Sequence, residues 1–580
     1  MVNLITENID IWTTAQIQKN GTGRGNGFNN RSLHGIKKLR ELILELAVRG
    51  KLVPQDPNDE PASVLLEKIA KEKIKLVKES KIQKEKPLPE ISEDEKPFNV
   101  PDIWAWVRFI DILDFTGGSQ PPKSNFSNVA LDGYVQLIQI RDLGSNPQNI
   151  YVPRESVSKF CTAKDIMVGR YGASVGKVFW GKDGAYNVAL IKLIDEFSVY
   201  QKTFLFNLMQ SPLIQSYFLS ITRSAQDGFS KNDIAPRLLP VPPRGEQHRI
   251  VAKVYELMDL CDKLEQQQTD NDMTQQTLVE TLLSTLTTAS NSDEFSEAWR
   301  RIANLFDILF TTEQSIDQLK QTILQLAVMG KLVPQDPIDE PASVLLEKIA
   351  KEKVQLIQEG KIKKEKALPK INDNEKPFEL PARWEWSRIG EASLYTEYGM
   401  SEKTFQNIEG IPVLTMGDIQ NGKVILGGQK LVSTSVEGLP NLYLKKGDLL
   451  YNRTNSAELV GKTGVFTGPD NAYTFASYLV RIRCMENCVH SVFLNLAMNT
   501  PLFRMTQIEP YLKQQCGQAN VNATIMKSMI VPIPPINEQR RIIAEVDKLM
   551  ALCDVLKARL KEAQITQIQL ADAIVDKVTV

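Results

Sequence analysis

The sequence holds three near matches to nucleotide-binding loops, and each fails at a residue that the chemistry needs. The Gly-Lys-Thr triplet at 461–463 resembles the end of a phosphate-binding loop, but the glycine required five positions before it is Ser456. The Gly-Lys pair at 176–177 fails in the same way. The glycine-rich stretch 21–27 does not satisfy the GxGxxG spacing of a dinucleotide-binding turn. The sequence therefore predicts no nucleotide cofactor in this chain.

The cysteines and histidines give one incomplete metal motif. Cys484, Cys488 and His490 supply three possible ligands in a short span, whereas a structural zinc site normally uses four. The six cysteines are otherwise scattered, so we expect strand and turn thiols rather than a metal site or a disulfide framework. The aromatic-terminated Asn/Asp-Pro-Pro motif expected of an amino-methyltransferase is missing as well. The sequence predicts neither a catalytic residue nor a metal ligand.

The composition is that of an ordinary globular protein, with 42% hydrophobic and 24% charged residues. Sparse cysteines, an N-terminus without a signal-peptide pattern and the lack of an apolar run of about 18 residues predict a cytoplasmic protein without a membrane span. A net charge of -1 argues against a protein that coats nucleic acid non-specifically. Residues 101–240 and 381–531, however, each carry 14 Lys and Arg against 12 Asp and Glu. That balance is compatible with a DNA reader whose partners supply part of the basic surface.

The chain contains a long internal repeat. Residues 47–73 return as 327–353 with only two differences, Arg49 to Met329 and Asn58 to Ile338. An offset of 280 residues is far too long for a solenoid, so it indicates a two-fold duplication of a whole module. The motif PxPPxxEQxRI, which begins at Pro240 and Pro532, repeats with an offset of 292. Two dissimilar inserts therefore lie within a duplicated frame.

The framing segments are predicted to be helices with apolar residues at the 3–4 spacing of coiled-coil packing. We expect the helix at about 246–286 to pair antiparallel with the helix at 312–329, and the helix at 538–580 to pair with the helix at 31–49. The predicted seam consists of Ile36, Leu39, Ile43, Leu46, Ile250, Val254, Leu257, Cys261, Leu264, Ile316, Leu319, Ile323, Leu326, Ile542, Val546, Leu549, Cys553 and Leu556.

The inserts are predicted to be strand-rich, because short β-favouring runs in them are interrupted by Gly, Pro and Asn. The fold class we expect is α+β, with two strand-rich domains separated by antiparallel coiled-coil helix pairs and related by a pseudo-two-fold repeat. The expected boundaries are an N-terminal helical repeat at 1–100, the first insert at 101–240, a central helical spacer at 241–380, the second insert at 381–532 and a C-terminal helix at 533–580.

This pattern resembles the specificity subunit of type I restriction-modification enzymes over essentially the whole chain. The duplicated block, the paired PxPPxxEQxRI boundaries and the divergent inserts carry the resemblance. Within the inserts, residues 164–178 and 446–463 are similar to that family's target-recognition pattern, an Asp-apolar-apolar turn followed by Arg and by Val-Gly-Lys. The first insert departs from it with Lys164 before the aspartate, where the second has Gly447.

The resemblance implies a non-catalytic subunit whose two target-recognition domains read the two halves of a bipartite site in double-stranded DNA. It implies two modification subunits, which bind S-adenosylmethionine and methylate a flipped-out adenine, and two ATP- and Mg-dependent restriction subunits. The helices would set the spacing and hold the modification subunits. Those cofactors would belong to the partners, with none in this chain.

Basic side chains in the inserts are the candidates for contact with phosphate or base edges. The alternative for each is a solvated surface charge, and the same alternative holds for the basic runs at 71–86 and 351–366. The tryptophan pairs at 104/106 and 384/386 are expected to pack in a core or hinge. The candidate DNA-binding residues are Lys123, Arg141, Arg170, Lys177, Lys430, Lys445, Arg453 and Lys462.

Two other functional classes compete with a specificity subunit. A catalytic enzyme, such as a fused methyltransferase or nuclease, is disfavoured by the missing motifs. A helical scaffold without DNA contact leaves unexplained why two dissimilar folded inserts occupy equivalent places in a duplicated frame.

Overall fold

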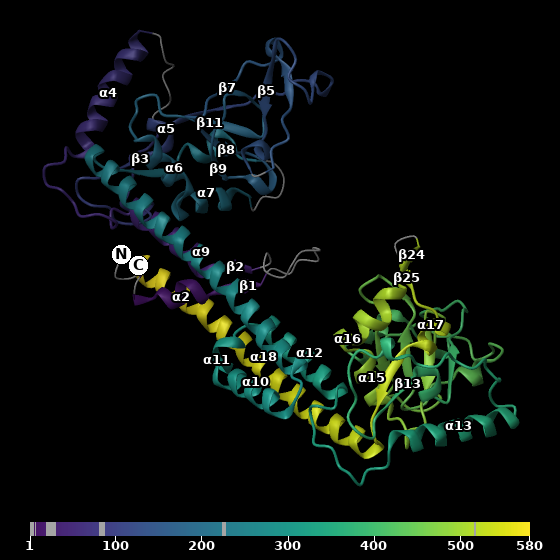
Figure 1. The fold of residues 1–580 in the computed structure, drawn as a ribbon. Helices are drawn as coiled ribbons and strands as arrows, with labels where there is room; N and C mark the ends of the chain where they lie inside the picture. The colour runs from purple at the N-terminus through teal and green to yellow at the C-terminus, as the bar shows by residue number, and fades with distance from the viewer. Residues whose placement is uncertain are drawn as a thin grey trace. The chain divides into compact units, whose positions relative to one another are not determined.

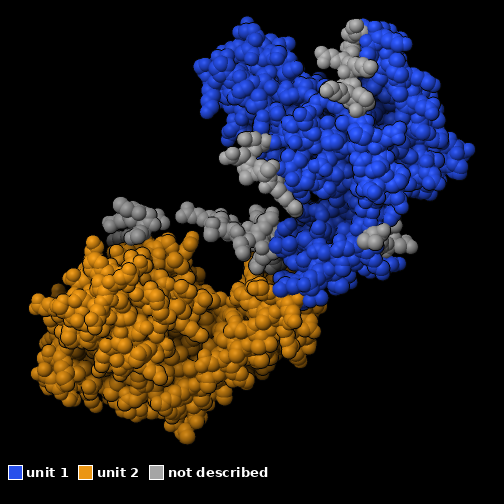
Figure 2. Space-filling model, turned by 180° about the vertical axis from the view of Figure 1, so that it is seen from behind, with its two compact units in different colours: residues 1–271, 563–580 blue, residues 272–562 orange. Residues whose placement is uncertain are grey.

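The computed structural model describes residues 5, 7–18, 31–79, 88–144, 146–222, 228–515 and 518–579. It divides into two compact units, one formed by residues 1–271 with 563–580 and the other by residues 272–562 (Figure 2). The glycine-rich stretch at 21–27 and residues 80–86 of the first basic run lie outside the described residues. Among the helices that the structure does describe, none is long and apolar enough to cross a membrane.

Unit 1 combines helices with a strand-rich domain at 105–241 (Figure 1). Its helices are α2 (Ile9–Thr14), α3 (His34–Val48), α4 (Ala62–Lys78), α5 (Phe109–Ile112), α6 (Lys202–Gln210), α7 (Pro212–Thr222), α8 (Lys231–Ile234), the first part of α9 (Arg244–Thr288) and the end of α18 (Ile536–Thr579). Its strands are β1 (Gln16–Gln18), β2 (Arg31–Leu33), β3 (Ala105–Arg108), β4 (Asp114–Gly117), β5 (Tyr134–Ile138), β6 (Tyr151–Pro153), β7 (Phe160–Cys161), β8 (Ile166–Gly169), β9 (Val178–Trp180), β10 (Gly184–Tyr186), β11 (Leu190–Ile194) and β12 (Leu238–Val241).

Unit 2 contains the second strand-rich domain, at 385–533. Its helices are the end of α9, α10 (Ser292–Asn304), α11 (Phe306–Leu309), α12 (Glu313–Val328), α13 (Ala342–Gln358), α14 (Ile389–Ala392), α15 (Ser491–Met498), α16 (Pro501–Phe503), α17 (Ala523–Ser528) and the first part of α18. Its strands are β13 (Glu385–Arg388), β14 (Tyr395–Tyr398), β15 (Ile411–Leu414), β16 (Ile419–Gln420), β17 (Lys423–Val424), β18 (Leu431–Val432), β19 (Leu449–Asn452), β20 (Thr454–Asn455), β21 (Thr463–Val465), β22 (Thr474–Phe475), β23 (Leu479–Arg483), β24 (Lys513–Gln515), β25 (Gln518–Asn520) and β26 (Ile530–Ile533). The predicted α+β class is confirmed.

Each strand-rich domain has a central strand whose two faces are both buried. In the sheet β4-β11-β8-β9, Ile166 and Val168 of β8 share a core with α6 and α7, whereas Met167 faces the core that contains β10. In the sheet of unit 2 that contains β14, β23, β19 and β21, Leu449 packs toward α15 and Leu450 packs toward β15 and β22. Because successive strand side chains point to opposite faces, one apolar run supplies both cores. The buried strands β8 and β19 fix the positions of the loops that follow them.

The helical seams pack within each unit. In unit 1, Arg40 of α3 donates to Asp262 (2.7 Å) and Gln55, beyond the end of α3, donates to Glu246 (2.6 Å), so α3 runs antiparallel to the start of α9. The seam of α3 and the seam of α9 from Ile250 to Leu264 belong to one core. The end of α18 runs parallel to α3, because His34 lies 3.0 Å from Asp572 and Arg49 donates to the carbonyl of Thr579.

Unit 2 repeats this arrangement. Lys557 contacts Asp317 (2.8 Å), and Gln335, beyond the end of α12, donates to Glu538 (2.7 Å), so α12 runs antiparallel to the start of α18. The seam at 316–326 shares a core with the α18 seam. The prediction that the end of α9 lies antiparallel to α12 is wrong. Gln318 donates to Glu280 (3.1 Å) and Lys331 donates to the carbonyl of Thr287 (2.9 Å), which makes the two helices parallel. Helices α10 and α11 add the extra reversal of the chain.

A buried carboxylate joins the first strand-rich domain to the helices. Glu246, in the first turn of α9, is fully buried. Its Oε2 accepts the indole N–H of Trp104 (2.7 Å) and its Oε1 accepts the amide of Gln55 (2.6 Å). The adjacent Gln247 accepts the backbone N–H of Gln201 (2.6 Å). Burial raises the pKa of the Glu246 carboxyl. We call Gln55, Trp104 and Glu246 the first junction.

The same contacts recur in unit 2. Glu538, in the first turn of α18, is 1% exposed and accepts the indole N–H of Trp384 (3.0 Å) and the amide of Gln335 (2.7 Å). Gln539 accepts the backbone N–H of His490 (2.8 Å). Burial raises the pKa of Glu538 as well. Gln335, Trp384 and Glu538 form the second junction, so the repeated PQDP and EQ motifs supply intrachain contacts.

Candidate DNA-recognition interface

In each strand-rich domain an arginine directly follows a central strand, and a Gly-Lys pair directly precedes a strand that pairs with that central strand. In unit 1 the loop spans 170–177, between β8 and β9, and the N–H of Gly169 donates to the carbonyl of Lys177 (2.8 Å). In unit 2 it spans 453–462, between β19 and β21, and Asn452 donates in the same way to Lys462 (2.9 Å). The structure therefore brings Arg170 close to Lys177 and Arg453 close to Lys462 in the chain's two equivalent hairpins.

Both arginines are anchored through the same edge of the guanidinium group. Nε of Arg170 donates to the carbonyl of Phe229 (3.1 Å), and Nε of Arg453 donates to the carbonyl of Ser477 (2.7 Å). The guanidinium carbons lie 5.1 Å from the ring centre of Tyr171 and 5.2 Å from that of Tyr398. Among the described residues, no carboxylate forms an ion pair with either guanidinium. An anchored and uncompensated guanidinium is suited to a phosphate or to a guanine edge.

A glycine closes each loop for a steric reason. Gly176 and Gly461 have φ of +78° and +89°, a conformation that favours glycine. A Cβ at Gly176 would lie 2.8 Å from Phe218, and a Cβ at Gly461 would lie 2.7 Å from Ile508. Each turn is therefore packed directly onto the helical part of its domain. That contact fixes the position of the neighbouring lysine, which directly precedes the next paired strand.

The turn before each central strand is kept despite the substitution at Lys164. Asp165 accepts the N–H of Thr162 (2.8 Å) through its side chain, and Asp448 accepts the N–H of Lys445 (2.8 Å). Gly447 has a φ of +91°, whereas Lys164 is not among the residues with positive φ. The aspartate side chain holds the turn in both domains, so a non-glycine residue is accommodated in the first.

The four other basic candidates lie outside the two loops. Lys123 and Arg141 are exposed on short 3-10 turns at 123–125 and 140–143, next to the sheet β6-β5-β10-β7. Lys430 is exposed before β18, and Lys445 is exposed in the turn before β19. Within the described part of the chain, no hydrogen bond joins any of the four side chains to Arg170 or Arg453. Their role in DNA contact stays a prediction.

Sequence reasoning missed the tyrosines that accompany the arginines. Tyr171, Tyr398 and Tyr478 are 39%, 44% and 45% exposed. The Arg-Tyr sequence at 170–171 was a usable signal. Tyr398 approaches Arg453 from another strand, so the local sequence could not reveal it.

The residues of the Gly-Lys-Thr triplet at 461–463 and of the incomplete zinc motif have structural roles. Thr463, which would bind a metal ion in a phosphate loop, is fully buried, and its hydroxyl donates to Asn495 (2.8 Å). Cys484 and Cys488 are buried in the core of unit 2, where burial raises the pKa of both thiols. In the residues that the structure describes, no group of three or more His, Cys, Asp or Glu could hold a metal ion.

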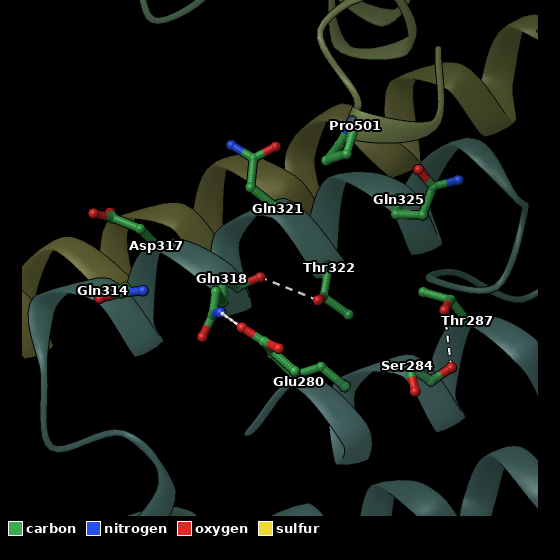
Figure 3. Close-up of a pocket in the computed structure, with 11 residues that line it drawn as sticks. Glu280, Ser284, Thr287, Gln314, Asp317, Gln318, Gln321, Thr322, Gln325 and Pro501 are labelled. Carbon is green, nitrogen blue, oxygen red and sulfur yellow. Dashed lines mark hydrogen bonds between the residues drawn. The ribbon is translucent and has the colours of Figure 1, made fainter. Parts of the chain in front are cut away.

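Unit 2 also has a groove of about 500 Å³ between the end of α9 and α12 (Figure 3). Some of its polar side chains bond to each other or to their own helix: Gln318 donates to Glu280 (3.1 Å), and the hydroxyl of Thr322 donates to the carbonyl of Gln318 (3.1 Å). The buried side-chain amide of Gln325 has no hydrogen-bond partner among the described residues. Glutamine, serine and threonine dominate the lining, and it brings together no nucleophile with a general base. The groove does not form an active site.

Comparison with known proteins agrees with this division into two readers on a duplicated frame. The family model described as "Type I restriction modification DNA specificity domain" matches residues 101–272 and 381–567. The specificity subunits of the type I restriction enzymes EcoEI and EcoAI of Escherichia coli are each 39% identical to the chain, over 99% of it and 98% of their own length. The chain belongs to the specificity subunits of type I restriction-modification enzymes.

This specificity subunit is therefore the DNA-specificity component of a type I complex, with two target-recognition domains and no catalytic activity of its own. The crystal structure of the HsdS subunit from Thermoanaerobacter tengcongensis is also similar, with 18% identity over 83% of this chain and 98% of that chain and a TM-score of 0.39. The two family matches begin at 101 and 381, close to the start of β3 and β13.

Substitution of Gly176 by alanine should destabilise unit 1 more than the same substitution at Gly172 in the same loop. Gly172 has a φ of +57°, and a Cβ added there would meet no atom within 4 Å, so its variant carries only the backbone cost of about 1–2 kcal/mol. Gly176→Ala adds the overlap with Phe218, worth about 1–3 kcal/mol more. Urea unfolding measures both variants, and equal losses would contradict the packing account.

Proposed function

We propose that the two target-recognition domains read the two halves of a bipartite site in double-stranded DNA. The observation that carries this proposal is the pair of equivalent loops, each with an anchored arginine beside a tyrosine, on two domains whose sequences differ. A nearly identical repeat beside each domain supports the same approach to DNA in both domains. Because the loop residues differ, each domain recognises a different half-site sequence. A symmetric dimer recognises a palindrome, whereas two different domains recognise an asymmetric site.

In this proposal Arg170, Lys177, Arg453 and Lys462 contact DNA directly. The four exposed residues of the outer turns, Lys123, Arg141, Lys430 and Lys445, add phosphate contacts that position each domain. Phosphate contacts contribute affinity without sequence information, while arginine on a guanine edge contributes discrimination. S-adenosylmethionine and ATP are bound by partner subunits, and the complex acts in the cytoplasm.

We also propose that the outer faces of α4 and α13 bind two copies of a modification subunit. Helix α4 buries Ala62 and Ile69, and α13 buries Ala342, Leu345 and Ile349. The opposite faces are exposed and nearly the same in both copies. They consist of Ser63, Glu67, Ala70, Lys71 and Ile74 on α4 and Ser343, Glu347, Ala350, Lys351 and Val354 on α13.

The composition of these faces suits a macromolecular partner. Ile74 is 58% and Val354 is 54% exposed, at the same place on the two helices. The small Ala70 and Ala350 allow close approach of another chain, and the same charged pair flanks each of them. In the part of the chain that the structure describes, the side chains at these positions form no hydrogen bond or ion pair, so binding of the same partner twice accounts for their identity. The two restriction subunits would join the complex that results.

Exchange of residues 101–240 for another target-recognition domain should change one half-site only. The junctions hold this segment by contacts that the repeat supplies to either domain, so the second domain keeps its place. Methylome sequencing of cells that express the hybrid with its partner subunits reads the new target directly. A change in both half-sites would contradict independent reading by the two domains.

Arg170→Lys should weaken discrimination in one half-site by about 1–3 kcal/mol, or roughly 5-fold to 150-fold, and Arg453→Lys should do so in the other. Lysine keeps the charge but loses the planar fork and the bond from Nε. Competition binding with DNA altered in one half-site at a time measures each effect. Arg301→Lys, on an exposed part of α10, is the matched control and should leave both half-sites unaffected. Equal effects of Arg170→Lys on both halves would contradict the assignment.

Ala70→Arg should leave a complex with one modification subunit, and Ala350→Arg should do the same, because each arginine obstructs one outer face. The double variant should bind none. Native mass spectrometry of the complex with saturating modification subunit counts the copies. Ala130→Arg, in an exposed loop of the first domain, serves as the control and should retain two copies. Two copies on the double variant would place the docking surface elsewhere.

A further inference from the structure

Both connections of each target-recognition domain to the rest of its unit pass beside a junction. The first domain begins with β3 and ends with β12, and these strands pair antiparallel, with Val241 opposite Ala105 and Leu238 opposite Arg108. Strands β13 and β26 pair in the same way in the second domain. Trp104 directly precedes β3, and Glu246 follows β12 by a few residues. A rotation of the domain on its helices would therefore act on the junction first.

The junctions leave little room for such a rotation. Gly50 and Gly330 each have a φ of +69°. A Cβ at Gly50 would lie 2.6 Å from Pro101, and a Cβ at Gly330 would lie 2.5 Å from Pro381. The end of each repeat helix is thus packed against the first residue of the following domain. The contact is the same in both units because the sequence of the repeat is the same.

Ion pairs from the repeat to the helix add a second attachment. Arg249 of α9 donates to Asp59 (2.6 Å), and Arg541 of α18 donates to Asp339 (2.7 Å). The side chain of Gln247 further donates to the carbonyl of Pro242 (3.0 Å) at the end of the first domain. Strand, repeat and helix are therefore bonded together at one place in each unit.

We propose that the two junctions are positioning devices that fix the angle of each target-recognition domain on its helix and thereby set the spacer length that the subunit accepts between its half-sites. Glu246 and Glu538 are the positioning residues. Each holds two donors from separate segments, and rotation of the domain would leave a buried carboxylate without them, which is strongly unfavourable. The proposal rests on the reading of a bipartite site proposed above.

The geometry of the junctions accounts for the presence of PQDP and EQ in both copies of the repeat. Glu246, Gln247 and Gln539 are fully buried, and Glu538 is 1% exposed, so a partner subunit cannot contact these side chains. Their identity between the repeats follows from intrachain geometry. A small change in the angle at a junction would displace the far end of the domain by a larger distance. Two junctions with the same contacts therefore hold both target-recognition domains at the same angle to their helices.

The test measures spacer discrimination by the complex of full-length subunit with its modification subunits. DNA substrates carry both half-sites with the natural spacer or with a spacer one base pair shorter or longer. For Glu246→Gln and Glu538→Gln, the ratio of methylation rates between natural and altered spacers should fall at least fivefold. Discrimination against a changed base within either half-site should stay within twofold. Trp104→Phe, which keeps the carboxylate and its bond to Gln55, should give a smaller fall in the same direction.

Lys253→Ala is the matched control, because it removes an exposed ion pair with Glu256 on the same helix, two turns beyond the first junction. It should leave the spacer ratio unchanged. A fall in rate by the same factor at every spacer would reduce the junctions to a role in stability and overturn the proposal, as would a change in base preference. Failure of the wild-type complex to methylate any bipartite site would instead overturn the proposed function.

Discussion

The structure depends on two buried carboxylates that, within the described ranges of the chain, bond directly to no cation. Glu246 and Glu538 are held by an indole N–H and a primary amide, with an arginine bonded to a neighbouring aspartate rather than to them. Burial of a carboxylate is unfavourable unless donors satisfy it, so each glutamate requires its tryptophan and glutamine to be in place together. These partners come from the repeat and from the residue that directly precedes the first strand of the domain. A single side chain thus makes three segments of the chain depend on one another.

This dependence changes how the internal repeat is understood. A block of 27 residues with two differences first suggests a surface that binds the same partner twice. The structure separates the block into two parts. Gln55 and Asp59 bond to α9 at the junction, whereas the residues on the exposed face of α4 do not take part in the junction. Internal geometry is sufficient to explain the first part. Only the second part calls for an external partner.

The features that were predictable from sequence are those with a local period. Spacings of three and four residues identified the seams, and the resemblance to the family's Asp-apolar-apolar, Arg and Val-Gly-Lys pattern pointed to the loops that follow β8 and β19. The partner of a helix was not predictable in this way: the α9–α12 pair was assigned the wrong direction because α10 and α11 lie between them and add a further reversal of the chain. Trp104 was expected in a core or hinge, but its bond to Glu246, 142 residues away, carries no local signal. Tyr398 beside Arg453 was missed for the same reason.

The frame is symmetric in its junctions and differs at its helix ends. In unit 1, Arg49 donates to the carbonyl of Thr579 at the end of α18 and to Glu45 (2.7 Å), whereas in unit 2 the corresponding residues are Met329 and Gln325. There Lys331 instead donates to the carbonyls of Thr287 and Ala289 (both 2.9 Å) at the end of α9. A cation near a helix C-terminus is favourable whether it is Arg49 or Lys331. The two copies of the repeat therefore differ where more than one cationic side chain can interact with a helix C-terminus. They have the same sequence where a buried carboxylate requires one particular arrangement of donors.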